Sequence, residues 1–143
     1  NILTNHAIQN NRITVFGGKQ YRPNIHIKDM CRSYLHILNQ DKNIVAGQTY
    51  NVGFENHTVE NLALIVKKVM GQDVLLKYVP TNDNRSYHIS SKKIIKDTGF
   101  VYKYKIEDAV IDLKNAFDKK LFKDTLNNPE YFNIKKMNIL NLK

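Results

Sequence analysis

The irregular spacing of short apolar strands and capped helices is the feature that most constrains the fold of this chain. Four short apolar stretches predict strands, and helical spacing of apolar residues appears between them. The distances between the predicted strands vary, so the pattern favours a small mixed α+β layer over a regular βαβ array. The predicted strands cover residues 12–16, 24–27, 48–53 and 74–79, and the predicted helices cover residues 1–10, 30–38, 58–71, 91–99 and 106–120.

The composition is that of one ordinary globular domain. The chain has 143 residues, of which 42% are hydrophobic and 24% are charged. No apolar run approaches the roughly 20 residues of a membrane span, and the first residues show no basic leader or cleavage site of a signal peptide. Cys31 is the sole cysteine, which excludes an internal disulfide. We therefore expect a cytoplasmic location with no membrane contact.

The formal net charge of +9 has three interpretations. Clustered basic residues attract an anionic ligand, they bind nucleic acid, or they only solvate the surface. Composition alone favours the last, because lysine outnumbers arginine and no basic-aromatic tract is present. The positions to consider are therefore the few arginines, which are Arg12, Arg22, Arg32 and Arg85.

Two of these arginines occupy loop positions that suit an anion. Arg22 follows the glycine turn of VFGGKQYRP, and Arg85 lies in the polar loop TNDNR. The planar guanidinium group suits bidentate capture of a phosphate. From the residues alone, pairing of Arg22 with Asp29 or with a helix C-terminus is an equal alternative. For Arg85, simple solvation is the more common outcome for a loop arginine.

Five motifs follow one another from residue 1 to residue 117. They are RITVFGG with YRPNIHIKD, then TYNVG, then TVENL, then DNRSY before SSKKIIKDTGF, and finally KIEDAV. In this order they resemble the C-terminal region of the extended short-chain dehydrogenase/reductases, the NAD-dependent nucleotide-sugar epimerases and dehydratases. The resemblance implies a small substrate-binding domain over residues 1–120 without the Rossmann domain of that family. The tail, residues 121–143, has no counterpart and receives no role.

The resemblance also implies which residues grip the substrate, a nucleotide-diphosphate sugar. Asn1 corresponds to an asparagine that contacts the diphosphate, and Arg22 to the arginine that binds it from the rim of a strand. Arg85 corresponds to a second arginine for the phosphate or ribose, and Tyr87 to a neighbour that reaches the same ligand. Two cations beside one diphosphate are also physically reasonable.

Three further positions are interpreted by the same resemblance. Val15 and Phe16 correspond to the strand whose backbone contacts the base. Asp29 we interpret as structural, either capping its helix or orienting Arg22. Lys105 departs from the family, which often has a capping serine or threonine there, so the start of that helix is less certain.

The chain lacks the residues that such enzymes use for NAD and for catalysis. Gly17-Gly18 is isolated and is not the Gly-rich turn of a dinucleotide site. Tyr131 and Lys135 have the family's Tyr-x-x-x-Lys spacing, but they lie in the tail, and we interpret this spacing as coincidental. The histidines show no metal-ligand spacing. We therefore expect no catalytic, cofactor-binding or metal-binding residue in this chain.

The resemblance then implies how the rest of the enzyme contributes. NAD is bound by a missing N-terminal domain of the same polypeptide, the complete enzyme is a homodimer, and the chain alone is inactive. Two alternatives stay open, which are a stand-alone nucleotide- or anion-binding module and a basic nucleic-acid-binding protein. The sequence does not distinguish epimerase from dehydratase or reductase.

Overall fold

The computed structural model describes residues 1–83 and 85–142, and it shows the predicted mixed α/β fold. Its elements are α1 (Ile2–Asn10), β1 (Arg12–Phe16), β2 (Tyr21–Asn24), α2 (Ile27–Leu38), α3 (Lys42–Val45), β3 (Glu55–Thr58), α4 (Val59–Met70), β4 (Leu75–Val79), α5 (Lys92–Thr98), α6 (Ile106–Asp118), the 3-10 helix η1 (Pro129–Tyr131) and α7 (Asn133–Ile139). Within the described residues, no helix is long and apolar enough to cross a bilayer.

The described strands form two small sheets. β1 pairs in parallel with β4, from Arg12 opposite Leu75 to Phe16 opposite Val79. β2 pairs antiparallel with β3, from Tyr21 opposite Thr58 to Asn24 opposite Glu55. The described strands therefore form no regular βαβ array, as their irregular spacing predicted.

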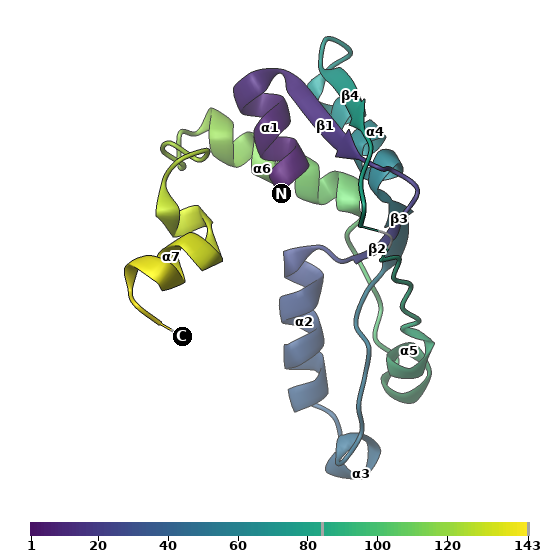
Figure 1. Ribbon diagram of the computed structural model, residues 1–143. Coiled ribbons are helices and arrows are strands. Elements are labelled where there is room, and N and C mark those ends of the chain that lie inside the picture. Colours follow the sequence, from purple (N-terminus) through teal and green to yellow (C-terminus); the bar gives the residue numbers. More distant parts are fainter. Residues whose placement is uncertain (84, 143) are drawn as a thin grey trace.

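The main core lies where α1, α4 and α6 surround β1, in the upper part of Figure 1. Side chains alternate along a strand, so Ile13 and Val15 of β1 both point inward and are fully buried. Ala63 and Val66 of α4 and Val110 of α6 meet them. Helices α2, α3 and α5 extend away from this body (Figure 1).

Several predicted boundaries are confirmed by their caps. The Thr58 hydroxyl accepts a hydrogen bond from the Asn61 amide at 3.1 Å, at the start of α4. Gly71 follows the last residue of α4, and Gly99 takes a left-handed conformation after α5. These ends were predictable because caps and C-terminal glycines depend only on neighbouring residues.

Two predicted strands are wrong. Residues 24–27 are not a strand, because β2 ends at Asn24 and His26 already caps α2, its Nδ1 accepting from the Lys28 amide at 3.1 Å. Residues 48–53 join no sheet. Gly53 is instead held by Ser91, whose hydroxyl accepts from the Gly53 amide at 2.9 Å and donates to its carbonyl at 2.7 Å.

Asp29 is structural, but it neither caps α2 nor orients Arg22. Its fully buried carboxylate accepts hydrogen bonds from the backbone amides of Lys103 and Tyr104, both at 2.9 Å, and pairs with Arg32. It therefore ties α2 to the segment that leads into α6.

The start of α6 compensates for the lysine at its N-cap. The Lys105 amide donates to Asp108 at 2.8 Å, and the Ile106 amide donates to Glu55 of β3 at 2.7 Å. Carboxylates satisfy the free amides of a helix N-terminus well. A residue distant in sequence thus supplies part of the cap.

The tail contacts the body at a few points. The Thr125 hydroxyl donates to the Asn5 side chain at 2.5 Å, and the Asn5 amide group donates back to the Thr125 carbonyl at 3.2 Å. Phe117 of α6 packs on Phe122, with ring centroids 5.1 Å apart. These contacts seat the start of the tail against α1 and α6. The division into a domain of residues 1–120 and a tail stays a prediction.

Candidate functional site

Arg22 and Arg85 lie together, although 62 residues separate them in the sequence. Both guanidinium groups contact the carboxylate of Asp83. Arg85 donates from Nε at 2.7 Å and from Nη2 at 2.9 Å, and Arg22 donates from Nη2 at 3.3 Å. We call Arg22, Asp83, Arg85 and Tyr87 the arginine cluster. Tyr87 belongs to it because its ring centroid lies 5.5 Å from Cζ of Arg22.

Backbone pairing brings the two arginine-bearing segments side by side. The Tyr87 amide donates to the Tyr21 carbonyl at 3.1 Å, and the Tyr21 amide donates to the Ser86 hydroxyl at 2.9 Å. Arg22 adds a bond from Nη1 to the Arg85 carbonyl at 2.6 Å. Residues 85–87 therefore run along the start of β2.

Local turn chemistry shapes the loop that carries Arg85. Pro80 follows the end of β4, where a residue without an amide proton cannot continue a ladder. The Asp83 amide then donates to the Thr81 hydroxyl at 3.2 Å, and the Arg85 amide donates to Asp83 at 3.2 Å. Short polar side chains commonly fold a chain back in this way.

The carboxylate and the arginine side chains of the cluster stay ionised at neutral pH. Hydrogen bonds from the side chain and backbone of Arg85 lower the pKa of Asp83 to about 2, with a smaller contribution from the charge of Arg22. The same contacts raise the pKa of Arg85. Arg85 is 72% exposed while Arg22 is 28% exposed, so one arginine reaches into solvent and the other is fixed against the backbone.

Two hollows include residues near β2 or the Arg85 loop in their linings, and one of them is lined by Asp83 of the cluster. One of 340 Å³ is lined by Gly17, Lys19, Gln20, Thr81, Asp83 and Ser86. A larger one of 670 Å³ includes Asn1, Pro23 and Asn24 in its lining and no residue of the cluster. Asp83 therefore borders the smaller hollow alone.

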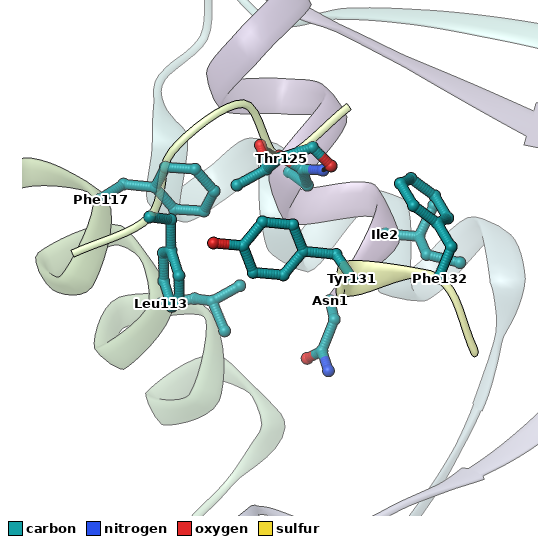
Figure 2. Close-up of a pocket in the computed structure, with 9 residues that line it drawn as sticks. Asn1, Ile2, Leu113, Phe117, Thr125, Tyr131 and Phe132 are labelled. Carbon is teal, nitrogen blue, oxygen red and sulfur yellow. Dashed lines mark hydrogen bonds between the residues drawn. The ribbon is translucent and has the colours of Figure 1, made fainter. Parts of the chain in front are cut away.

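Asn1 lies away from the arginine cluster, at the start of α1. Its side chain makes no capping hydrogen bond, and it lines the larger hollow as well as a separate aromatic pocket of 250 Å³. Figure 2 shows this pocket, with the Tyr131 ring between Asn1 and the side chains of Leu113 and Phe117. Asn1 therefore shares a hollow with Pro23 and Asn24, and among the described residues no hydrogen bond joins it to Arg22.

Val15 and Phe16 sit at the end of β1 and face opposite ways. Val15 is fully buried in the core, whereas Phe16 is 54% exposed. The Phe16 carbonyl already accepts from the Gly18 amide at 2.9 Å and from the Gln20 side chain at 2.7 Å. The side chain of Val15 is thus closed to a ligand, and the predicted role of its backbone stays a prediction.

Asp83 is the member of the cluster that the sequence analysis did not single out. The only signal was its position two residues before Arg85, and short Asp-x-Arg spacings are common in polar loops. Its second contact, with Arg22, depends on the three-dimensional placement of the loop. For that reason sequence reasoning assigned it no role.

Tyr131 and Lys135, which have the Tyr-x-x-x-Lys spacing, do not share a helix. Tyr131 ends η1 and packs edge-on against Phe122, while Lys135 belongs to α7 and lies 4.4 Å from the centroid of the Phe132 ring. The two residues therefore have separate partners.

The glycine turn after β1 does not fit the phosphates of NAD. It leads into β2 and not into a helix, and the carbonyl of Gly18 accepts from the Glu60 amide at 3.0 Å, which satisfies part of the N-terminus of α4. A Cβ at Gly17 would lie 2.5 Å from the Thr81 side chain, so its space is already filled. Among the described residues, no group of three or more His, Cys, Asp or Glu is placed to hold a metal ion.

Comparison with known proteins agrees with this architecture. Residues 1–53 match the model of the NAD dependent epimerase/dehydratase family. The resemblance to the NAD-dependent epimerase/dehydratase family is confirmed. A search of the curated proteins gave no match.

Solved structures with the same fold include relatives of several activities. UDP-glucose 4-epimerase from Thermotoga maritima, solved with UDP-glucose, is 22% identical over 85% of this chain and 39% of its own, with a TM-score of 0.71. L-threonine dehydrogenase from Phytophthora infestans is 17% identical over 82% and 40%, also with a TM-score of 0.71. dTDP-glucose 4,6-dehydratase from Bacillus anthracis, solved with NAD, is 21% identical over 82% and 38%, with a TM-score of 0.64.

The fold is thus that of the C-terminal part of epimerase/dehydratase structures. The chain spans about 40% of the length of the structures that it matches. At these identities the likeness establishes the fold and leaves the substrate open.

Proposed function

We propose that this chain is the substrate-binding part of an NAD-dependent epimerase/dehydratase that acts on a nucleotide-diphosphate sugar. The observation that carries the proposal is the convergence of Arg22 and Arg85 on one carboxylate. Two guanidinium groups that share one anion are spaced to share another, and a diphosphate offers oxygens to both. Tyr87 belongs to the same cluster, Asn1 reaches the ligand from the separate hollow that it lines, and the backbone of Val15 and Phe16, at the end of β1, lies beside the base.

In this proposal the chain binds and orients the substrate and performs no chemical step. NAD and the catalytic Tyr-x-x-x-Lys pair belong to a Rossmann domain of the same polypeptide, and NAD accepts and returns the hydride there. The arginines hold the diphosphate so that the sugar is presented in one orientation, which lowers the entropic cost of the reaction. The isolated chain is then inactive.

The surface of α2 supports contact with another part of the polypeptide. Ile27, Leu35 and Leu38 are exposed by 61–79% on this helix. Clustered exposed apolar side chains usually mark a surface that is covered by a partner. We propose that the Rossmann domain provides this cover, that the complete enzyme is a homodimer, and that it resides in the cytoplasm.

The two alternative functions receive less support. A stand-alone anion-binding module and a nucleic-acid-binding protein both explain the charge of +9, but neither explains the match to an enzyme family over residues 1–53. Because L-threonine dehydrogenases share the fold, L-threonine belongs among the ligands to be tested.

We expect Arg22→Ala and Arg85→Ala each to raise the KM for the nucleotide sugar about tenfold to a hundredfold. A hydrogen bond to a charged group contributes roughly 1.5–3 kcal/mol. The affinity for NAD should stay unchanged, because neither arginine lies in a dinucleotide cradle. The measurement is steady-state kinetics of the complete enzyme, which includes the Rossmann domain, with UDP-, dTDP- and ADP-sugars and with L-threonine, together with NAD titration.

Arg12→Ala is the matched control, because Arg12 is exposed at the far end of β1 and should leave both constants unchanged. Turnover of L-threonine without any nucleotide-sugar binding would contradict the proposal. So would a selective loss of NAD affinity in the two cluster variants.

A further inference from the structure

Asp83 occupies the position between the two arginines that an anionic ligand would take. We infer that Asp83 is a specificity-determining residue: its carboxylate competes with the ligand for Arg22 and Arg85, and so disfavours ligands that carry a terminal phosphate. This inference rests on the proposed function, because it concerns the same arginines. It adds which diphosphates the site accepts.

The contacts of Arg85 show why Asp83 acts as a competitor. Nε and Nη2 of Arg85 both donate to the Asp83 carboxylate, which is the bidentate geometry that a phosphate would also use. A phosphate that binds Arg85 in this way must displace Asp83 from at least one of these bonds. The carboxylate and the ligand therefore compete for the same donors.

Arg22, in contrast, has backbone partners besides Asp83. Its Nη1 donates to the carbonyls of Tyr21 at 2.9 Å and Arg85 at 2.6 Å, and its Nη2 reaches Asp83 at the longer distance of 3.3 Å. The bond to Tyr21 does not involve the loop that Asp83 closes through the Arg85 amide. We therefore expect Arg22 to stay beside the site when the carboxylate is replaced.

Charge determines which ligands suffer most from the competition. Two arginines and one aspartate give the cluster a net charge of +1, by the sum +2 − 1. A phosphate within a diester carries about one negative charge, whereas a terminal phosphate carries roughly 1.5 to 2. A nucleotide sugar, whose diphosphate is esterified at both ends, therefore meets less repulsion from Asp83 than a nucleoside diphosphate does.

The test is calorimetric titration of the complete enzyme, with the Rossmann domain present, and of its Asp83→Asn variant. The ligands are UDP, dTDP and ADP and their glucose conjugates. The nucleoside diphosphate and nucleotide sugar that the unchanged protein binds are then titrated into the variants. We expect Asp83→Asn to tighten the nucleoside diphosphate about fivefold, which is the effect of one unit charge about 4 Å away in water. The nucleotide sugar should tighten by a smaller factor, so that the ratio of the two dissociation constants changes.

Two controls separate this inference from the proposed function. Asp118→Asn removes an exposed carboxylate at the end of α6 and should leave the ratio unchanged. Asp83→Ser removes the same charge with a different side chain and should reproduce the changed ratio. Suppose the protein binds both ligands through the arginines, but the ratio of their dissociation constants stays constant in both Asp83 variants, or both ligands weaken equally. The inference about Asp83 is then wrong, while the proposed function stands. If the unchanged protein binds no diphosphate, the proposed function itself fails.

Discussion

Asp29→Ala is expected to lower the free energy of unfolding by about 3 kcal/mol. The carboxylate is fully buried and accepts from the amides of Lys103 and Tyr104. Without it, these amides lose their acceptor and Arg32 loses its partner. A buried donor left without an acceptor costs about 1–3 kcal/mol. Urea denaturation of the full chain, followed by circular dichroism, measures the change.

Asp118→Ala is the matched control for this prediction. Asp118 makes a single ion pair with Lys114 one turn earlier in α6, and its side chain is 62% exposed. Exposed pairs of this kind contribute at most about 1 kcal/mol. Equal destabilisation by the two variants would show that the buried bonds of Asp29 contribute nothing special, and the interpretation of this residue would be wrong.

Asp29 also illustrates which parts of the fold the sequence predicts. Its place at the start of a helix suggested a cap, because a cap needs only nearby residues. Its two backbone partners lie more than 70 residues away, Arg32 is its only partner within one helical turn among the described contacts, and His26 takes the capping role. The caps that were correct, such as Thr58, depend on contacts within one helical turn.

The errors in the strands have a similar origin. Residues 48–53 have the composition of a strand, but the extended segment finds no ladder partner and is held by Ser91. A Cβ on Gly53 would lie 2.2 Å from the Ile89 side chain, so a larger residue here would have to displace a side chain from a distant segment. Sequence patterns report the tendency to extend and do not report which neighbour is present.

In the candidate site, too, local features were predictable and contacts between distant segments were not. The sequence placed Arg22 and Arg85 in loops, and the resemblance suggested that both face one ligand. The loop position was wrong for Arg22, which lies in β2 because its segment pairs with β3. The convergence of the two arginines depends on the pairing of Tyr21 with Ser86 and Tyr87, which no local pattern reveals. Asp83 stayed unassigned because its importance arises only once both arginines surround it. Asn1 was grouped with them, yet the structure places it on a neighbouring hollow.

The core around β1 determines whether these loops keep their positions. β1 runs in parallel beside β4, and both site loops leave from the same end of this pair, after Phe16 and after Val79. The Gly17 amide donates to the Val79 carbonyl at 2.8 Å and so joins the two exits. Damage to β1 is therefore expected to weaken the site as well as the fold.

Ile13→Ala is the substitution that tests how far β1 stabilises the core. Ile13 is fully buried at the centre of the core, and replacing such a side chain by alanine costs about 2–5 kcal/mol, depending on how far the cavity collapses. Leu75→Ala is the control, since Leu75 lies on the neighbouring strand β4 but is 64% exposed. We expect Ile13→Ala to shift the urea midpoint strongly and Leu75→Ala to shift it little. Equal shifts would mean that Ile13 is not in the stabilising core, and the placement of β1 between α1 and α4 would then be wrong.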